Sequence, residues 1–587
     1  MYDRWSLDVL YKGLDDPKFS EDRKKLSEAI EEMIALADEW EKNPGANRRE
    51  MTRKTLLLRE KFELLVFDLL GYLSLRQAAD TRDTDAAGLQ GAIENELTKT
   101  AKANVVLDRL ISEKGTVEEL VGDDPLLNEY KFYLGTIFRE AKHRLSDDAE
   151  AMYVKMNLTG GSAWSKLFDY LTATLEVDFN GEKTNLSTIR NKATDPDREV
   201  RSAAYEAELA AYPKIADSVA FALNNIKSQV TMMARERGYA SPLDQTLQES
   251  NMKRETLDAM LSAMVDYMPK FREYMRAKAR YIGAGERLAW YDTVAPVGSS
   301  HKKYTKEEAH HYLVDCFAAF SQDMADMMDR AFKEEWIDFD PRPGKVGGAF
   351  CAGLLGHEQA RILTNFDGSF DAVDTLAHEL GHAYHDKHTD CHRPLNHDYC
   401  MQVAETASTF NETHIMNKAV SEAEGEEKLA LLDGLLSGVN QVIVDIYSRY
   451  LFETEVFARC EDELLMPKDL CDIMLRAQEQ SYGDGLDPEK RHPYMWCCKS
   501  HYYSEGLSFY NFPYAFGQLF AMGLYSQYQK EGAAFVPKYQ ALLRATPVST
   551  VEETAAMAGI DVTKKEFWEE SLQICAKLID EFIALTK

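Results

Sequence analysis

Three residues near the middle of the chain could bind a metal ion and use it. Half of the chain's 14 histidines lie between residues 371 and 414, and the pentapeptide HELGH places His378 and His382 four residues apart. On an α-helix, positions i and i+4 lie one above the other on the same face, so two imidazoles can reach one ion. Glu379 lies one residue round the helix, close enough to act as a base on a water held there. This spacing predicts a metal-dependent hydrolytic centre.

The neighbouring residues favour a buried helix. The apolar surface around the histidines comes from Leu376, Ala377, Leu380, Ala383 and Tyr384. Gly381 costs a helix about 1 kcal/mol relative to alanine, so we expect another backbone or a substrate to approach closely there. The alternative interpretation is an amphipathic helix whose histidines hold no metal.

A third ligand is needed, because catalytic zinc usually takes three protein ligands and leaves one position for water. His388 has the spacing of the third ligand in H-E-x-x-H-x-x-G-x-x-H, but His385 stands where that pattern needs glycine. The helix would then continue and carry His388 away. Glu405, in VAETASTFNETH, could be presented by a second helix packed against the first. We favour Glu405, against the alternative of a solvated helix acid.

Two further acids and one loop lie close to these candidates. Asp374, one turn before His378, and Glu412, two turns after Glu405, are either hydrogen-bond partners of the ligands or surface acids. Residues 391–400, CHRPLNHDYC, contain two cysteines and two histidines. Their spacing does not match a common zinc knuckle, so we interpret the segment as the loop that joins the two site helices.

Taken together, these motifs resemble the oligoendopeptidase F branch of the thimet-oligopeptidase-like zinc peptidases. The likeness rests on HELGHAYH and AETASTFNE, on GKVGGAFCAGL upstream and on SHYYSEGLSFYNFPYAFG downstream, and it extends over most of the chain. The resemblance implies a mainly α, large helical zinc-peptidase fold with a small β-sheet beside the HExxH helix and a deep substrate channel. It also implies one Zn²⁺ per chain, held by His378, His382 and Glu405, with Glu379 as the catalytic base.

The resemblance also assigns roles to residues near the C-terminal end. A histidine and a tyrosine that stabilise the transition state in that family match His501 and Tyr510, and Tyr514 is a looser match. A tyrosine hydroxyl or an imidazole can donate to an oxyanion as a carbonyl becomes tetrahedral. On composition alone, these aromatic residues could equally be buried and bonded to backbone.

Composition limits the partners and the compartment. Lys and Arg total 68 against 98 acids in 587 residues, a net charge of −30. Such a charge repels phosphate backbones and anionic membrane surfaces, so we expect neither nucleic acid nor a membrane as partner. Nine cysteines without disulfide-like spacing, and an N-terminus without an apolar signal core, predict a cytoplasmic setting. We interpret the uncharged run 506–529 as buried beside the active site rather than spanning a bilayer.

Helical periodicity dominates the remaining sequence. We expect helices over 21–43 and 50–79, the second broken or kinked near Gly71, and a hairpin turn at Asn180-Gly181. Two short strands are predicted near 346–351 and 361–366; a substrate peptide could pair with their edge, or the sheet could only support the site helix. We place the main boundary near residue 185, between an N-terminal helical region (1–185) and a catalytic zinc-peptidase domain (186–587).

These observations predict a zinc-dependent endopeptidase that hydrolyses internal bonds of short oligopeptides by metal-activated water. One alternative is a metallocarboxypeptidase on a similar helical scaffold, which would require a free C-terminus. The other is a non-catalytic peptide-binding protein whose HELGH motif is coincidental. An amidated C-terminus would stop the carboxypeptidase but not the endopeptidase, and the binding protein would leave its peptide intact.

Overall fold

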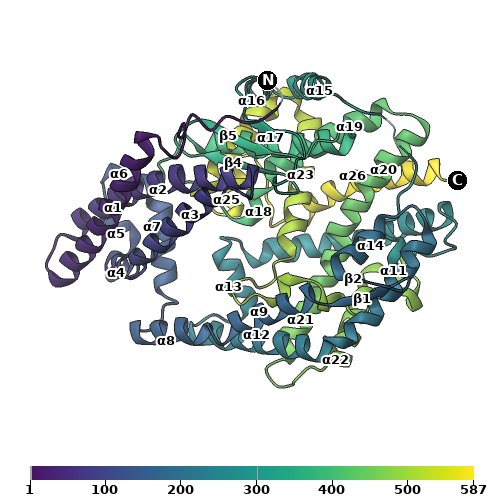
Figure 1. Cartoon of the computed structure of the whole chain (residues 1–587), viewed down its shortest axis with the longest axis horizontal. Helices are drawn as coiled ribbons and strands as arrows, with labels where there is room; N and C mark the ends of the chain where they lie inside the picture. The colour runs from purple at the N-terminus through teal and green to yellow at the C-terminus, as the bar shows by residue number, and fades with distance from the viewer. Residues whose placement is uncertain (1–2, 300–301) are drawn as a thin grey trace. The chain divides into compact units, whose positions relative to one another are not determined.

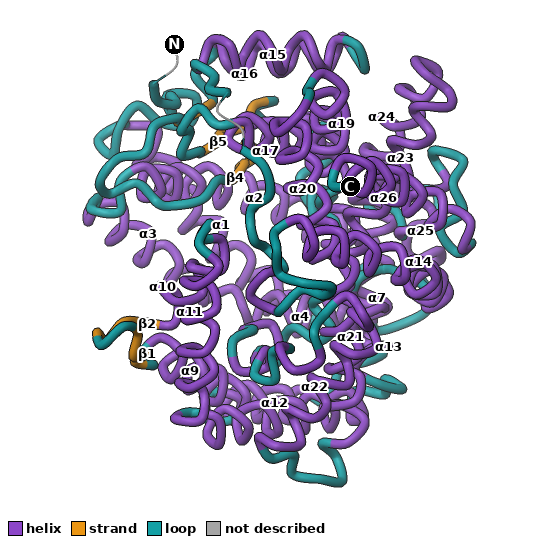
Figure 2. Tube along the Cα trace, turned by 90° about the vertical axis from the view of Figure 1, so that its right-hand side faces the viewer, coloured by secondary structure: helices purple, strands orange, loops and turns teal. Residues whose placement is uncertain are grey.

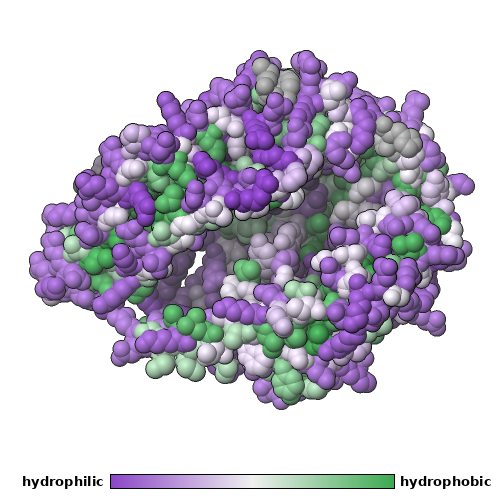
Figure 3. All heavy atoms as spheres, in the orientation of Figure 1, coloured by the Kyte–Doolittle hydropathy of each residue, from purple (hydrophilic) through white to green (hydrophobic). Residues whose placement is uncertain are grey.

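The computed structural model describes residues 3–299 and 302–587 and is built almost entirely of helices (Figure 1). Strands occupy only two places in the described residues, shown in orange in Figure 2. The expected mainly α fold with a small β-sheet is therefore confirmed. Hydrophilic side chains cover most of the face seen in Figure 3, in keeping with the net charge of −30.

The chain divides into two compact units, each assembled from three separate stretches of sequence. Unit 1 comprises Met1–His143, Lys302–Ile415 and Gln527–Gly559, and unit 2 comprises Arg144–His301, Met416–Ser526 and Ile560–Lys587. The boundary predicted near residue 185 coincides with no border of these units, because residue 185 lies inside the first stretch of unit 2.

Unit 1 contains the helices of the first 143 residues and those around the HELGH motif. Its α-helices are α1 (Pro17–Lys42), α2 (Arg48–Ala79), α3 (Thr84–Leu97), α4 (Ala101–Ser112), α5 (Val117–Val121), α6 (Pro125–Glu129), α7 (Lys131–Ala141), α15 (Lys306–Ala318), α16 (Gln322–Lys333), α17 (Phe370–Thr389), α18 (Met401–Ala404), α24 (Val536–Ala545) and α25 (Val551–Ala556).

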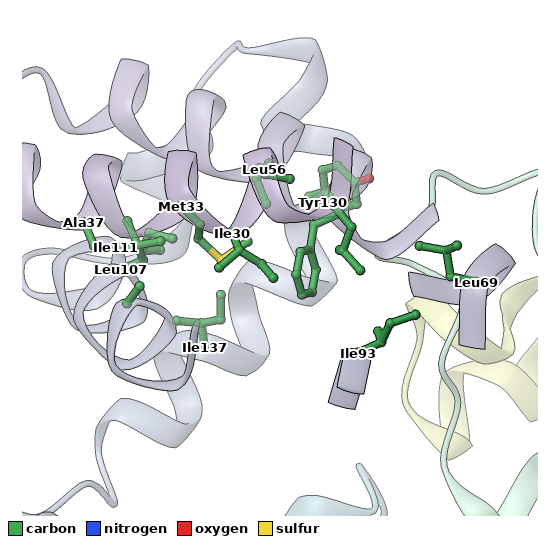
Figure 4. Close-up of a cluster of buried hydrophobic side chains, with 14 of the residues drawn as sticks. Ile30, Met33, Ala37, Leu56, Leu69, Ile93, Leu107, Ile111, Tyr130 and Ile137 are labelled. Atoms are coloured by element: carbon green, nitrogen blue, oxygen red, sulfur yellow. The ribbon is translucent and has the colours of Figure 1, made fainter. Parts of the chain in front are cut away.

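Local signals explain where α1 begins and what it buries. Asp16 accepts a hydrogen bond from the backbone N–H of Lys18, and Pro17 occupies the first turn, where its missing N–H costs nothing. The apolar residues that recur every three or four positions are buried: Leu26, Ile30, Met33, Ala37 and Trp40. They pack against α2, α4 and α7 in the cluster of Figure 4. Helix α2 continues through Gly71 without interruption, so of the two predicted alternatives, a break or a kink, the break is wrong.

The sheet of unit 1 lies against the HELGH helix. Its strands are β3 (Ile337–Asp338), β4 (Phe350–Leu354) and β5 (Gln359–Leu363), in the order β3-β5-β4, with β3 parallel and β4 antiparallel to β5. Both β4 and β5 contact α17, beside which they are drawn in Figures 1 and 2. Because β4 pairs with β5 on one side only, it is an edge strand.

The described residues of unit 2 form helices and one β-hairpin. Its α-helices are α8 (Asp147–Asn157), α9 (Gly161–Ala173), α10 (Leu186–Arg190), α11 (Arg198–Ala211), α12 (Ala216–Glu236), α13 (Pro242–Glu249), α14 (Arg254–Tyr281), α20 (Gly425–Asn440), α21 (Ile446–Arg459), α22 (Pro467–Tyr482) and α26 (Lys565–Leu585). The hairpin pairs β1 (Glu176–Phe179) with β2 (Glu182–Asn185). Asn180 and Gly181 both have positive φ, as the predicted two-residue turn requires.

Two helices cross from one unit to the other along the chain: α19 (Thr406–Glu422) and α23 (Phe512–Glu531). Helix α23 contains most of the uncharged run 506–529 and is buried over most of its length, as expected of that run. A different stretch, Gly425–Arg459, is long and apolar enough to cross a membrane by length and composition alone. It carries three buried, ion-paired acids, Asp433, Asp445 and Glu453. It is therefore a core helix of unit 2.

Candidate metal centre and active site

Helix α17 presents the two histidines of the HELGH motif. Ser369 caps the helix by accepting a hydrogen bond from the N–H of Ala372 over 3.1 Å. The helix then runs without a break to Thr389, passing through His385 as the sequence predicts. His388 lies one turn after His385 and is buried, with its ring centroid 4.6 Å from that of Tyr384. The chain therefore does not turn after HELGH.

A second helix crosses α17 and brings Glu405 to the histidines. Glu405 lies at the junction of α18 and α19. A Cβ on Gly381 would lie only 2.6 Å from the carbonyl oxygen of Ala407, so the close approach expected at this glycine is made by backbone. Asn411 donates from Nδ2 to the carbonyl of Ala377 over 2.9 Å, which ties the two helices together.

The donor atoms of three residues form a nearly equilateral triangle. His378 Nε2 lies 3.2 Å from His382 Nε2, and each lies 3.4 Å from Glu405 Oε2. Ligands at the usual zinc distances of 2.0–2.1 Å, arranged tetrahedrally, would be separated by about 3.3 Å. Two imidazoles and a carboxylate are also the donor types that catalytic zinc takes. The three residues therefore fit one ion, whereas His388 is not among them.

The acids suspected of supporting the ligands have different environments. Glu412 accepts a hydrogen bond from His378 Nδ1 over 2.7 Å, which directs Nε2 toward the other ligands. Burial alone would lower the pKa of His378, but this bond and the charges of Glu412 and Glu405 raise it to about 9. One carboxylate oxygen of Asp374 is buried without a hydrogen bond among the described residues. Burial, followed by the charge of Glu412, raises the pKa of Asp374 well above its usual range.

Glu379 and Glu405 face the same cavity, but the pKa of Glu379 is raised and that of Glu405 is lowered. Burial raises the pKa of Glu379, although the two site histidines oppose the shift. Burial opposes ionisation of Glu405 as well, but the hydrogen bond and charge of His382, with help from Ser408, lower its pKa to about 2. Glu405 is thus held as an anion suited to bind a cation, while Glu379 is suited to exchange a proton.

The cavity at this site has a volume of about 570 Å³ and lies within unit 1. One wall is β4, from Phe350 to Leu354, and the opposite side carries the three candidate ligands and Glu379. The edge strand β4 therefore lines the same cavity as the candidate ligands.

Two further residues of this cavity were not singled out from the sequence. Asp386 lies against Gly353 of β4, where any Cβ would come within 2.4 Å of its carboxylate, and burial raises the pKa of this carboxyl. Tyr399 hydrogen-bonds to Asp386 and stacks on His385 with ring centroids 4.3 Å apart. Helical periodicity could have found Asp386, since it follows His382 by four residues on the same helix face. No local pattern marks Tyr399, which lies in the loop 391–400 between the site helices.

The residues assigned to transition-state stabilisation lie together within unit 2. The ring of Tyr510 meets that of His501 edge-on at 5.3 Å, and Tyr514 is 5.7 Å from Tyr510 and 6.0 Å from His501. Burial, with the charges of Arg449 and Lys499, lowers the pKa of His501. His501 is therefore neutral near pH 7 and can donate one N–H.

Comparison with known families identifies the class of this protein. The chain belongs to peptidase family M3, whose model matches residues 192–574. A second model, described as Oligopeptidase F, matches residues 112–176, and the predicted boundary near residue 185 falls between the two matches. The chain is therefore a metallopeptidase, and the resemblance to oligoendopeptidase F is confirmed.

Relatives from several bacteria cover the chain almost completely. Oligopeptidase PepF of Bacillus subtilis is 25% identical over 592 residues, which span 99% of this chain and 86% of the relative. Group B oligopeptidase PepB of Streptococcus agalactiae is 26% identical over an alignment that covers 77% of this chain and 76% of the PepB chain. Among solved structures, oligoendopeptidase-F from Enterococcus faecium has a TM-score of 0.70 at 18% identity, covering 97% of this chain and 98% of its own. That likeness establishes a shared fold.

Proposed function

We propose that this chain is a zinc-dependent endopeptidase that hydrolyses internal bonds of short oligopeptides. The observation that carries the proposal is the triangle of donor atoms from His378, His382 and Glu405, with Glu379 facing the same cavity. The names of its relatives, oligopeptidase and oligoendopeptidase F, support the substrate class. One zinc ion per chain matches one donor triangle.

Glu379 carries the proton through the proposed reaction. Zinc, when bound, lowers the pKa of a water molecule and polarises the substrate carbonyl. Glu379 accepts the proton of the attacking water as the new C–O bond forms, and then delivers it to the amide nitrogen as the C–N bond breaks. Its burial raises the pKa of the carboxyl, which favours acceptance of the proton from water.

The aromatic cluster of unit 2 supplies the second part of the proposed mechanism. Tyr510 and His501 each donate one hydrogen bond to the oxyanion that develops at the carbonyl, and Tyr514 is a further candidate donor. Removing one such donor costs about 10²–10³ in kcat. The lowered pKa of His501 supports this role, since a neutral imidazole retains the N–H that it needs to donate.

Strand β4 offers a way to bind peptides of many sequences. It lines the cavity and pairs with β5 on one side only, so a substrate can add to its unpaired side through main-chain hydrogen bonds. Main-chain pairing does not depend on side-chain identity, which suits an enzyme that accepts varied oligopeptides. If the sheet only supported α17, substitutions on the exposed side of β4 would leave KM unchanged.

The test is hydrolysis of an internally quenched, extended peptide of about ten residues with an amidated C-terminus. We expect internal cleavage that a chelator abolishes and zinc restores. Glu379→Gln is the matched variant, because it should keep its zinc and lose nearly all turnover. Cleavage only of peptides with a free C-terminus would indicate the carboxypeptidase, and peptide binding without cleavage or zinc would indicate the binding protein.

We also propose a cytoplasmic, reducing location without nucleic acid or membrane as partner. Support comes from the nine cysteines, none of them joined in a disulfide among the described residues, and from the net negative charge. Cell fractionation with thiol labelling tests this proposal. Recovery of the native protein from an oxidising compartment with paired cysteines would contradict it.

A further inference from the structure

The turn that carries Tyr510 is held in a conformation that its residues do not favour by themselves. Phe509, directly before Tyr510, has φ of +55°, in the left-handed region that costs a bulky residue roughly 1–3 kcal/mol. The N–H of Asn511 donates to the carbonyl of Phe509 over 2.7 Å, closing a tight turn around Tyr510. Such a turn persists only where surrounding groups stabilise it.

A single buried carboxylate supplies that stabilisation. Glu453, on α21, accepts from the backbone N–H of Phe509 over 3.1 Å and from Asn511 Nδ2 over 2.8 Å. It therefore binds the residues on both sides of Tyr510. Glu453 is 1% exposed, so these hydrogen bonds do not compete with water.

Lys227, on α12, holds this carboxylate from the other side. Its Nζ donates to Glu453 Oε1 over 2.7 Å, and both side chains are almost fully buried. The same Nζ lies 4.6 Å from the centroid of the Phe457 ring, on which the Phe509 ring stacks at 5.3 Å. Lys227, Glu453 and the turn thus form one packed cluster from three separate parts of unit 2.

The turn also sets the start of α23 and hence the position of Tyr514. Asn511 Oδ1 accepts from the N–H of Phe512 over 2.7 Å, and the Asn511 carbonyl accepts from the N–H of Tyr514 over 3.2 Å. A shift of the turn would therefore move both tyrosines relative to His501.

We propose that Glu453, fixed by Lys227, is a positioning residue that holds Tyr510 in place for the reaction. The inference rests on the proposed role of Tyr510 as a donor to the oxyanion. A buried ion pair is a costly way to fill space, since apolar residues of similar volume often stabilise a protein as well or better. Here the charge supplies something that apolar packing cannot, namely an acceptor for two donors that flank the functional tyrosine.

A double-mutant cycle separates positioning from general stability. We expect Glu453→Gln to lower kcat by up to about 10²-fold with little change in KM, because misplacing a catalytic group by about 1 Å costs that much. In a Tyr510→Phe background, the same change should lower kcat by less than about twofold, since residues that act as a unit are not additive. Equal losses in the two backgrounds would overturn the proposal.

Asp433→Asn is the matched control. Asp433 also pairs with a buried lysine, Lys278, at 2.9 Å and accepts from Tyr274 over 2.7 Å, but it makes no contact with the turn among the described residues. Asp433→Asn should change kcat by the same factor in the wild type and in the Tyr510→Phe background. Glu453→Asp guards against misfolding, because it keeps the charge beside Lys227 but cannot reach both that lysine and the turn. Full kcat in Glu453→Asp would overturn the proposal.

Amide hydrogen exchange provides a readout that does not need activity. Glu453→Gln should speed exchange in residues 506–516 of the zinc-loaded protein, whereas Asp433→Asn should not. If the wild type cleaved no peptide while exchange responded as expected, the proposed function would fall and the coupling of Glu453 to the turn would stand. If Glu453→Gln left amide exchange in residues 506–516 unchanged, that result alone would contradict the positioning role of Glu453.

Discussion

Glu412 accepts a hydrogen bond from His378 Nδ1 over 2.7 Å, across the crossing of α19 over α17. This contact fixes both the tautomer and the ring orientation of His378, because the proton must reside on Nδ1 when Nε2 binds a metal. The ligand is therefore oriented before any ion arrives.

Replacing Glu412 should weaken metal binding without removing a ligand. We expect Glu412→Ala to lower zinc affinity by about 10–100-fold, the usual effect of losing the partner of a ligand histidine. Competition with a chelating dye measures the affinity. Glu422→Ala is the control, since Glu422 is exposed on the same helix. Equal affinities for the two variants would show that Glu412 does not orient His378.

The third ligand can be decided by a pair of substitutions. Glu405→Ala should lose most of its zinc on dialysis, because it removes one corner of the donor triangle. His388→Ala should keep one zinc per chain, since His388 is buried beside Tyr384. Elemental analysis gives the metal content of each. Loss of zinc from His388→Ala alone would reverse the assignment.

Gly381 should tolerate no side chain, although alanine favours helices. A Cβ there would lie 2.6 Å from both Ala407 O and Ser408 Cα, so α19 would have to move away from α17. We expect Gly381→Ala to destabilise the protein by about 1–3 kcal/mol, the cost of overpacking, and to weaken zinc binding by displacing Glu405. Urea denaturation measures the stability. Gly88→Ala, in an exposed helix position with open space around it, should instead stabilise by about 0.4–1 kcal/mol.

Acid should destabilise the protein partly through His385. This residue is fully buried and bonded to Thr546 Oγ1 at 2.8 Å, and burial lowers its pKa to about 3 from the ordinary 6.5. Between these values the unfolded chain binds a proton that the folded chain does not. The free energy of unfolding therefore falls as pH drops below 6.5, by at most about 1.4 kcal/mol per pH unit for this group.

His385→Gln removes that titration. The midpoint of urea unfolding should then fall less steeply between pH 7 and pH 5 than in the wild type. His311→Gln should keep the wild-type slope, because the side chain of His311 is exposed. An identical slope for His385→Gln and the wild type would exclude His385 as a source of acid sensitivity.

The features predicted well from sequence depend on local signals. The continuation of α17 through His385 follows from the absence of glycine at that position, and the hairpin follows from Asn180-Gly181. The two strands beside the site lie a few residues from their predicted positions. A short apolar run indicates that a strand is present better than it indicates where the strand ends. The break expected at Gly71 does not occur, since the helix is packed on both sides of that residue.

Other features depend on contacts that no local pattern records. Lys227 and Glu453 are 226 residues apart, and neither has a neighbour in sequence that suggests a buried ion pair. The division into two units likewise arises from contacts between distant stretches. An acid on a helix is most often solvated, so only the folded chain distinguishes Glu453 from such residues.

The bond between His385 and Thr546 joins residues 161 positions apart and has a consequence for synthesis. The helix that holds the metal ligands leaves the ribosome long before the stretch Gln527–Gly559, which completes unit 1. During translation the His385 imidazole therefore lacks its hydrogen-bond partner Thr546, and the His378–His382 pair exists on an unfinished unit. Zinc acquisition should consequently be a late event, coupled to chain release rather than to the emergence of the motif that binds it.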